Sequence, residues 1–361
     1  MTKSNEQNIL VGIDVGSTTT KIVAVDANDR HQLLFSDYAR HHANQIASVI
    51  RSIKKFCGHI RDKKIRLCLT GSGAKPVASI LKVPFVQEVA ANAIALQDQF
   101  DQVGTAIELG GQDAKMIFFK DSENGQPQSV ADMRMNGSCA GGTGAFIDEI
   151  ASVLKVPVEQ FNELAQKGTH LYDISGRCGV YAKTDIQPLI NDGAAREDLA
   201  ASIFQAVVNQ TISGLACGKP IRGHVAFLGG PLHFLSELKT AFVRTLKLDD
   251  EHTIVPDNSH LFAAIGSAMN ADGKTEISLL ALKKRLEEKV AIDFEVARLE
   301  PLFKDQAEYD EFLARQSVNN VVTADLSTYE GNCYLGIDAG STTTKAALVG
   351  EDGALLYSFY S

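Results

Sequence analysis

The stretch GIDVGSTTTK at residues 12–21 decides the fold of this chain, because it returns as GIDAGSTTTK at residues 336–345. The two copies differ only where Val15 is replaced by Ala339. A full domain's length of sequence follows the first copy, whereas 16 residues follow the second. We therefore expect one complete module and the opening hairpin of another, in a chain that is a piece of a longer protein.

Each copy has the residues of a hairpin whose tip binds phosphate. An apolar, β-rich run precedes the tip and a second one follows it, which predicts a strand, a turn and a strand. Gly16 lets the backbone approach an anion closely. Ser17 and Thr18 to Thr20 supply small hydroxyl and amide donors, and Lys21 adds a positive charge.

The carboxylate of Asp14 would repel phosphate unless a Mg²⁺ ion and its waters lay between them. The alternative is an ordinary β-turn beside a buried aspartate. The repetition of the whole string favours the phosphate-binding interpretation, because turn chemistry alone does not require so many matched positions.

Two further glycine pairs follow in order. ELGGQDAK at 108–115 has the same design, with Gly110 and Gly111 between Glu108 and Asp113, and with Lys115 after them. LGGP at 228–231 places Gly229 and Gly230 before an expected helix, where they could lie against an adenine or a ribose.

The pattern of the remaining chain is typical of an α/β protein in which hairpins with glycine-rich tips alternate with helices. Strands are expected at 9–15, 21–25, 31–37, 65–70 and 224–231. Residues 106–119 are expected to form two further strands joined by a Gly-Gly turn. Helices are expected at about 43–57, 88–100, 145–154, 184–191, 195–217, 231–247 and 259–270. The domains expected are a module at 1–272, a charged helical linker at 273–332 and the start of a second module at 333–361.

Composition excludes several classes of partner. The net charge of −9 argues against nucleic acids and acidic membranes, which require a basic surface. No apolar run approaches the roughly 18–20 residues of a membrane span. The first residues lack the apolar core of a signal peptide, so we expect a cytoplasmic protein.

The ordered set GIDxGSTTTK, LGGQD and LGGP resembles the actin-like ATPase superfamily over residues 9 to about 270. The resemblance implies two ribonuclease-H-like halves that close on ATP or ADP with Mg²⁺. It also implies catalytic roles for Asp14, Gln112 and Asp113. The nucleotide-binding residues it implies are Gly16, Ser17, Thr18, Thr19, Lys21, Glu108, Gly110, Gly111, Lys115, Gly142, Thr143, Gly229 and Gly230.

Two cysteine motifs narrow the resemblance. NGSCAGGTGAFIDEIA (136–151) and GRCGVYAKTDIQPLI (176–190) resemble those of the ATP-dependent activators of 2-hydroxyacyl-CoA dehydratases, relatives of the benzoyl-CoA reductase ATPase subunits. In that family two cysteines per subunit hold one 4Fe–4S cluster across a homodimer axis. The resemblance assigns the ligand role to Cys139 and Cys178. The alternative is that both cysteines are small apolar side chains buried in the core.

The chemistry of the cluster agrees with this implication. A cubane needs four thiolates, and two chains would supply four. Both cysteines lie in glycine-rich turns ahead of expected helices, whose free amides and dipoles favour thiolates. The sequence is most similar to the long, tandem-module activators, although Glu108 stands where the family's short members more often have Asp. The metal-facing role of position 108 therefore stays open.

The expected function is ATP-driven electron transfer. The protein would take one electron from a ferredoxin or flavodoxin and deliver it to an iron–sulfur dehydratase or reductase. A small-molecule kinase and a non-catalytic ATP switch on the same fold are the alternatives, and neither requires iron.

Overall fold

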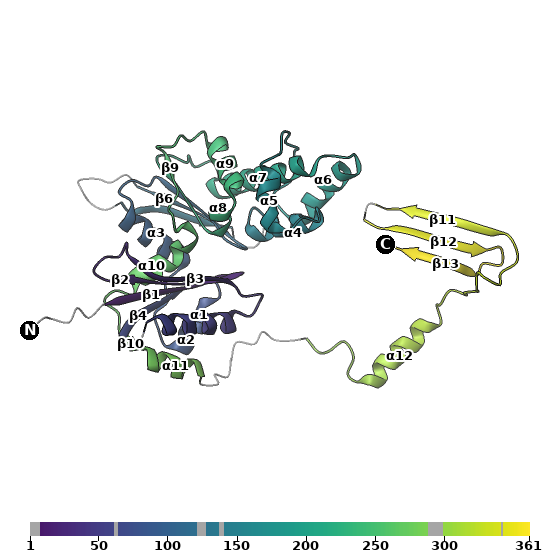
Figure 1. Cartoon of the computed structure of the whole chain (residues 1–361), viewed down its shortest axis with the longest axis horizontal. Coiled ribbons are helices and arrows are strands. Elements are labelled where there is room, and N and C mark those ends of the chain that lie inside the picture. Colours follow the sequence, from purple (N-terminus) through teal and green to yellow (C-terminus); the bar gives the residue numbers. More distant parts are fainter. Residues whose placement is uncertain (1–7, 61–63, 121–127, 137–140, 288–298, 341) are drawn as a thin grey trace, which may run out of the picture. The chain divides into compact units, whose positions relative to one another are not determined.

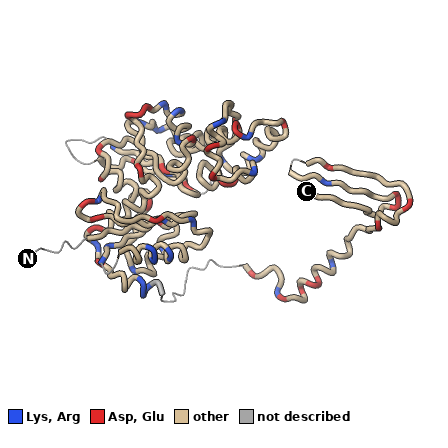
Figure 2. The backbone as a smooth tube through the Cα atoms, in the orientation of Figure 1, with Lys and Arg blue, Asp and Glu red and all other residues tan. Residues whose placement is uncertain are grey.

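The computed structural model describes residues 8–60, 64–120, 128–136, 141–287, 299–340 and 342–361. The chain divides into two compact units, Met1–Ala291 and Ile292–Ser361. The first unit carries two five-stranded sheets and the second carries a three-stranded sheet (Figure 1). Figure 2 shows acidic and basic residues interspersed along both units, with basic residues gathered at α11 (Leu279–Glu287).

The first lobe of unit one is built on the sheet β10-β4-β1-β2-β3. Its central strand β1 (Ile9–Val15) is buried along its whole length, which explains its nearly continuous apolar sequence. It pairs antiparallel with β2 (Thr19–Asp26) and parallel with β4 (Lys64–Thr70). The edge strands are β3 (Leu33–Arg40) and β10 (Glu276–Ser278).

Helices cover both faces of this sheet. Ile9, Val11 and Ile13 share a core with α1 (Gln45–His59) and α2 (Ala74–Leu81). The alternate residue Leu10 packs with α10 (Phe262–Asn270), which follows the 3₁₀ turn Ser259–Leu261, and with α3 (Glu88–Gln99). This second core also takes in the other sheet and so joins the two lobes.

The second lobe repeats the plan of the first. Its sheet has the order β7-β6-β5-β8-β9, with β5 antiparallel to β6 and parallel to β8. The relation of β5 to its two neighbours is therefore that of β1 to β2 and β4. The strands are β5 (Thr105–Leu109), β6 (Ala114–Phe119), β7 (Val130–Met135), β8 (Val225–Leu228) and β9 (Thr253–Ile254). The helices are α4 (Gly144–Val153), α5 (Val158–Ala165), α6 (Gly179–Asn191), α7 (Arg196–Thr211), α8 (Gly230–Phe234) and α9 (Ser236–Leu246).

Two helix predictions need correction. The helix expected at 184–191 begins earlier, at Gly179, because Gly179 packs closely against Glu149 of α4. The helix expected at 231–247 is two helices, since the backbone of Leu235 is not helical. The strands β7, β9 and β10 and the helices α2 and α5 were not predicted.

The long apolar helix expected at 195–217 is α7 followed by one π-helical turn, Ile212–Ala216. By length and composition Arg196–Ala216 could cross a bilayer. However, 61% of its most apolar window is buried inside the protein, which is the pattern of a core helix.

Part of the expected linker packs on unit one, because β10 pairs with β4 and α11 contacts α2. Unit two contains α12 (Gln306–Ser317) and the strands β11 (Cys333–Ala339), β12 (Thr344–Gly350) and β13 (Leu355–Tyr360). The strands pair in the order β11-β12-β13, and their side chains are mostly exposed.

Candidate active site

The first candidate phosphate loop is the tip of the β1–β2 hairpin. Gly16 donates its backbone N–H to the carbonyl of Thr19 at 2.9 Å. Asp14 and Lys21 face each other across the two strands, and Lys21 Nζ donates to Asp14 Oδ2 at 2.6 Å. The other carboxylate oxygen, Asp14 Oδ1, is buried and has no partner among the described residues. A hydrated Mg²⁺ ion fits such an acceptor.

The second candidate loop is the tip of the β5–β6 hairpin. Gly110 donates to the carbonyl of Asp113 at 2.8 Å. Lys115 is fully buried and bridges Glu108 and Asp113, each at 3.0 Å, and Glu88 at 3.2 Å. Glu88 begins α3 and was not predicted as a site residue, because an acidic residue in a first helical turn is ordinarily explained by the helix dipole.

The two hairpins and the start of α3 bring together four carboxylates and two lysines. Burial and the nearby Glu108 carboxylate raise the pKa of Glu88 to about 8. Burial alone would lower the pKa of Lys21, but the negative charges of Asp14, Glu88 and Glu108 raise that pKa above its ordinary value. Lys115 likewise keeps a raised pKa, because Glu108 and Glu88 outweigh its burial. Both lysines are therefore charged and are held by the surrounding carboxylates.

The two tips and α4 meet directly. A Cβ atom on Gly111 would overlap the side chain of Thr18, so glycine is required for the tips to approach. Gly144 and Ala145, at the start of α4, donate to the carbonyls of Gly110 (3.1 Å) and Gly111 (2.7 Å). The second loop and the beginning of α4 consequently form one hydrogen-bonded unit.

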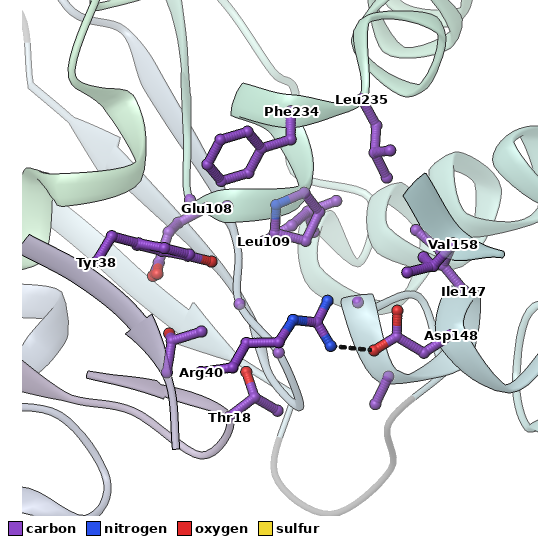
Figure 3. A pocket seen from close by; sticks show the side chains of 18 of the residues that line it. Thr18, Tyr38, Arg40, Glu108, Leu109, Ile147, Asp148, Val158, Phe234 and Leu235 are labelled. Carbon is purple, nitrogen blue, oxygen red and sulfur yellow. Dashed lines mark hydrogen bonds and ion pairs between the residues drawn. The ribbon is translucent and has the colours of Figure 1, made fainter. Parts of the chain in front are cut away.

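A cavity of about 420 Å³ opens between these elements (Figure 3). Eight predicted residues line it, namely Thr18, Thr19, Lys21, Glu108, Gly110, Gly111, Gly229 and Gly230. The described residues that were predicted but do not line it are Asp14, Gly16, Ser17, Gln112, Asp113, Lys115, Gly142 and Thr143. Of these, Asp14, Lys115, Gly142 and Thr143 are buried, and Asp14 and Lys115 lie behind the loop tips as supports.

The third glycine-containing loop, with Gly229 and Gly230, forms another wall of the cavity. Gly229 has φ +92°, and a Cβ atom there would overlap the carbonyl oxygen of Leu109. Gly230 begins α8. The cavity also has apolar lining suited to a flat base, from Ile147, Val158, Phe234 and Leu235.

Sequence reasoning missed several lining residues, including Tyr38, Arg40 and Asp148. Tyr38 and Arg40 lie two residues apart on β3, so they project from the same face of the strand. The sequence signal was the alternation in SDYAR (36–40), which becomes informative only once β3 is known to border the loop.

One of the two predicted cluster ligands is described. Cys178 precedes α6 with an extended backbone and is partly exposed. Cys139 lies outside the described residues, but Gly141, two residues after it, touches the segment of Cys178. A Cβ atom on Gly141 would overlap the carbonyl oxygen of Arg177. Among the described residues no three His, Cys, Asp or Glu side chains converge on a metal position.

Comparisons with known proteins agree with this geometry. The profile of the BadF/BadG/BcrA/BcrD ATPase family matches residues 11–271. An uncharacterized protein of Methanocaldococcus jannaschii is 28% identical over 279 residues, which cover 76% of this chain but only 64% of that relative. The (R)-2-hydroxyglutaryl-CoA dehydratase activating ATPase of Acidaminococcus fermentans is 30% identical over 225 residues, 61% of this chain and 82% of that one.

Two solved structures share the fold. Component A of the Acidaminococcus fermentans (R)-2-hydroxyglutaryl-CoA dehydratase has 26% identity and a TM-score of 0.63, covering 77% of this chain and 99% of that one. The activator of the 2-hydroxyisocaproyl-CoA dehydratase from Clostridium difficile, with bound ADPNP, has 23% identity and a TM-score of 0.62, covering 81% and 100%. These likenesses confirm the predicted actin-like α/β fold.

Proposed function

This chain belongs to the BadF/BadG/BcrA/BcrD ATPase family, and from this premise we propose that it is an ATP-hydrolysing activator that donates electrons to an iron–sulfur enzyme. Membership confirms the family predicted from the repeated string and the cysteine motifs. One named relative is a dehydratase activating ATPase and one similar structure is a dehydratase activator, so the acceptor proposed is a 2-hydroxyacyl-CoA dehydratase or a related reductase. A ferredoxin or flavodoxin in the cytoplasm would supply the electron.

ATP would occupy the cavity between the three glycine-tipped loops. The tips at Thr18 and Gly111 offer small side chains and backbone amides to the phosphates, while Gly230 and the apolar lining accept the adenosine. Asp14 Oδ1 and Asp113 would hold the waters of a Mg²⁺ ion, which neutralises phosphate charge when bound. Gln112, exposed at the second tip, would orient the attacking water.

Cys139 and Cys178 would hold half of a 4Fe–4S cluster, and a second copy of the chain would complete it. Such a cluster supplies one-electron transfer when bound. The free amides at the start of α6 favour the thiolate of Cys178. Val180 and Tyr181 are exposed beside it and give a dimer apolar surface to bury.

A single observation carries the proposal. Gly141, between Cys139 and α4, touches Arg177 next to Cys178, and α4 itself is bonded to the second phosphate loop. Gly141 and the segment of Cys178 are therefore in contact beside the helix that is bonded to the second phosphate loop. A shift of that loop on ATP binding or hydrolysis would reach them through α4.

Anaerobic reconstitution with iron and sulfide tests the proposal. We expect about four irons per dimer in the wild type, and their loss in Cys139→Ser and in Cys178→Ser. Cys217→Ser is the matched control, because Cys217 is an exposed cysteine outside both motifs and should leave iron binding unchanged. Iron-free wild-type protein that still binds ATP would instead favour a kinase or an ATP switch.

A further inference from the structure

Arg40 reaches across the candidate ATP cavity from one lobe to the other. It ends β3 in the first lobe, and its Nη1 pairs with Oδ2 of Asp148, on α4 of the second lobe, at 3.2 Å (Figure 3). Both residues line the cavity. Their side chains are 53% and 37% exposed, so the pair is solvated and weak. A ligand that offers the guanidinium a stronger anion can displace Asp148.

The backbone of Arg40 is fixed to the first phosphate loop. Arg40 pairs with Thr19 across β2 and β3. The next residue, His41, is buried, donates its N–H to the Thr18 carbonyl at 3.1 Å and places Nε2 at 3.1 Å from the Gly16 carbonyl. The strand end therefore holds a fixed position beside the loop, while the long side chain of Arg40 can change partner.

The charge lining the cavity leaves Arg40 a specific role. Lys21 and Arg40 are the two cations among the described lining residues. Lys21 is nearly buried and is already paired with Asp14. Lys115, behind the second loop, is held by three carboxylates. Arg40 is consequently the lining cation whose charge is free to meet a highly anionic ligand.

We propose that Arg40 is a phosphate-binding residue for ATP and ADP, and that its guanidinium leaves Asp148 to bind the polyphosphate. This inference rests on the proposed ATP-binding function. A guanidinium can give two parallel N–H donors to a phosphate, which makes the phosphate a better partner than a solvated carboxylate. Asp148 then disfavours ATP twice, because it competes for Arg40 and adds negative charge to the cavity.

Calorimetric titration with adenosine, ADP and ATP tests the assignment. We expect Arg40→Met to weaken ATP and ADP binding by about 10- to 100-fold, the ordinary range for a charged hydrogen bond, with adenosine binding unchanged. Arg40→Lys should recover part of the loss, since it keeps the charge without the planar fork. Asp148→Asn should tighten ATP binding, about 2- to 5-fold on the scale of an exposed pair.

Arg30→Met is the matched control. Arg30 is also a partly exposed arginine paired with an aspartate, Asp272, but it lies outside this cavity. Equal weakening of adenosine and ATP by Arg40→Met would make Arg40 a structural residue and overturn the assignment. Undiminished ATP binding by Arg40→Met would overturn it too, while leaving the proposed function standing. Failure of the wild type to bind any adenine nucleotide would reject both.

Discussion

The β1–β2 and β11–β12 hairpins have nearly the same sequence at their tips and the same internal geometry. Asp14 faces Lys21 in the first, as Asp338 faces Lys345 in the second. The lysine–aspartate distances are 2.6 and 2.7 Å. The registers between the second and third strands shift at equivalent points, Ala24/Val25 and Leu348/Val349. The two copies of the string therefore lie in the same hairpin with the same ion pair in both units.

The surroundings of the two hairpins differ completely. The side chains of Asp14 and Lys21 are 0% and 11% exposed, whereas those of Asp338 and Lys345 are 63% and 46% exposed. In unit one, β4 and α10 pack beside β1. In the described part of unit two, β11 pairs with β12 alone. The comparison therefore separates two contributions. The string is associated with the hairpin geometry in both units, and the rest of the module adds the burial of that hairpin and the surrounding carboxylates.

The largest expected difference concerns the first glycine of each copy. A Cβ atom on Gly12 would overlap the backbone of α10 at Ala264, whereas one on Gly336 would make only an ordinary van der Waals contact with the Ala347 carbonyl oxygen at 3.9 Å. Gly12→Val should destabilise unit one by more than about 4 kcal/mol, because backbone cannot move aside as a side chain can. Hydrogen exchange of each hairpin measures the effect.

Gly336→Val is the matched variant for that experiment and should leave the exchange of both hairpins unchanged. Equal protection of β1 in the two variants would contradict the close packing of α10 on β1.

The next largest difference concerns the ion pairs. Lys21→Met leaves the buried Asp14 without its partner and should cost unit one about 3 kcal/mol. Lys345→Met removes the same contact in solvent and should barely change the melting of unit two. Thermal denaturation followed by circular dichroism, with hydrogen exchange to assign each transition to its unit, compares the two. Similar losses of stability in the two variants would mean that burial does not determine how much this ion pair contributes to the free energy of unfolding.

The last expected difference is in pH dependence. The raised pKa of Glu88, about 8, means that the folded state holds a proton that an unfolded glutamate releases near its ordinary value of 4.5. The stability of unit one should therefore fall as pH rises from about 4.5 to 8. Glu88→Gln should flatten that slope. Melting temperatures measured across this window test it, and an unchanged slope in Glu88→Gln would assign the titration to another group.

The repeated string made much of the fold predictable. Strand, turn and strand were readable because apolar runs flank glycine at each tip, and residues of all three glycine motifs line the cavity. Gly229 and Gly230 could be identified as candidate ligand contacts because a buried strand that runs into a glycine pair before a helix is typical of a ligand-binding turn.

The rest of the site depended on contacts between distant segments. Glu88 joins Lys115 only because α3 packs beside β6, and Arg40 meets Asp148 only because the lobes face each other across the cavity. Short elements such as β10 carry too few residues to show a period, and tertiary pairing with β4 alone makes them strands.

The matched register of the two hairpins has a consequence for folding kinetics. The strand before the tip in one copy can pair with the strand after the tip in the other copy, because the two hairpins have nearly the same pairing contacts. During synthesis the first hairpin can form well before the second string is made. In refolding from denaturant both strings are present at once and compete. We therefore expect a slow refolding phase in which mispaired strands separate, and we expect this phase to be absent from a variant that ends before residue 333.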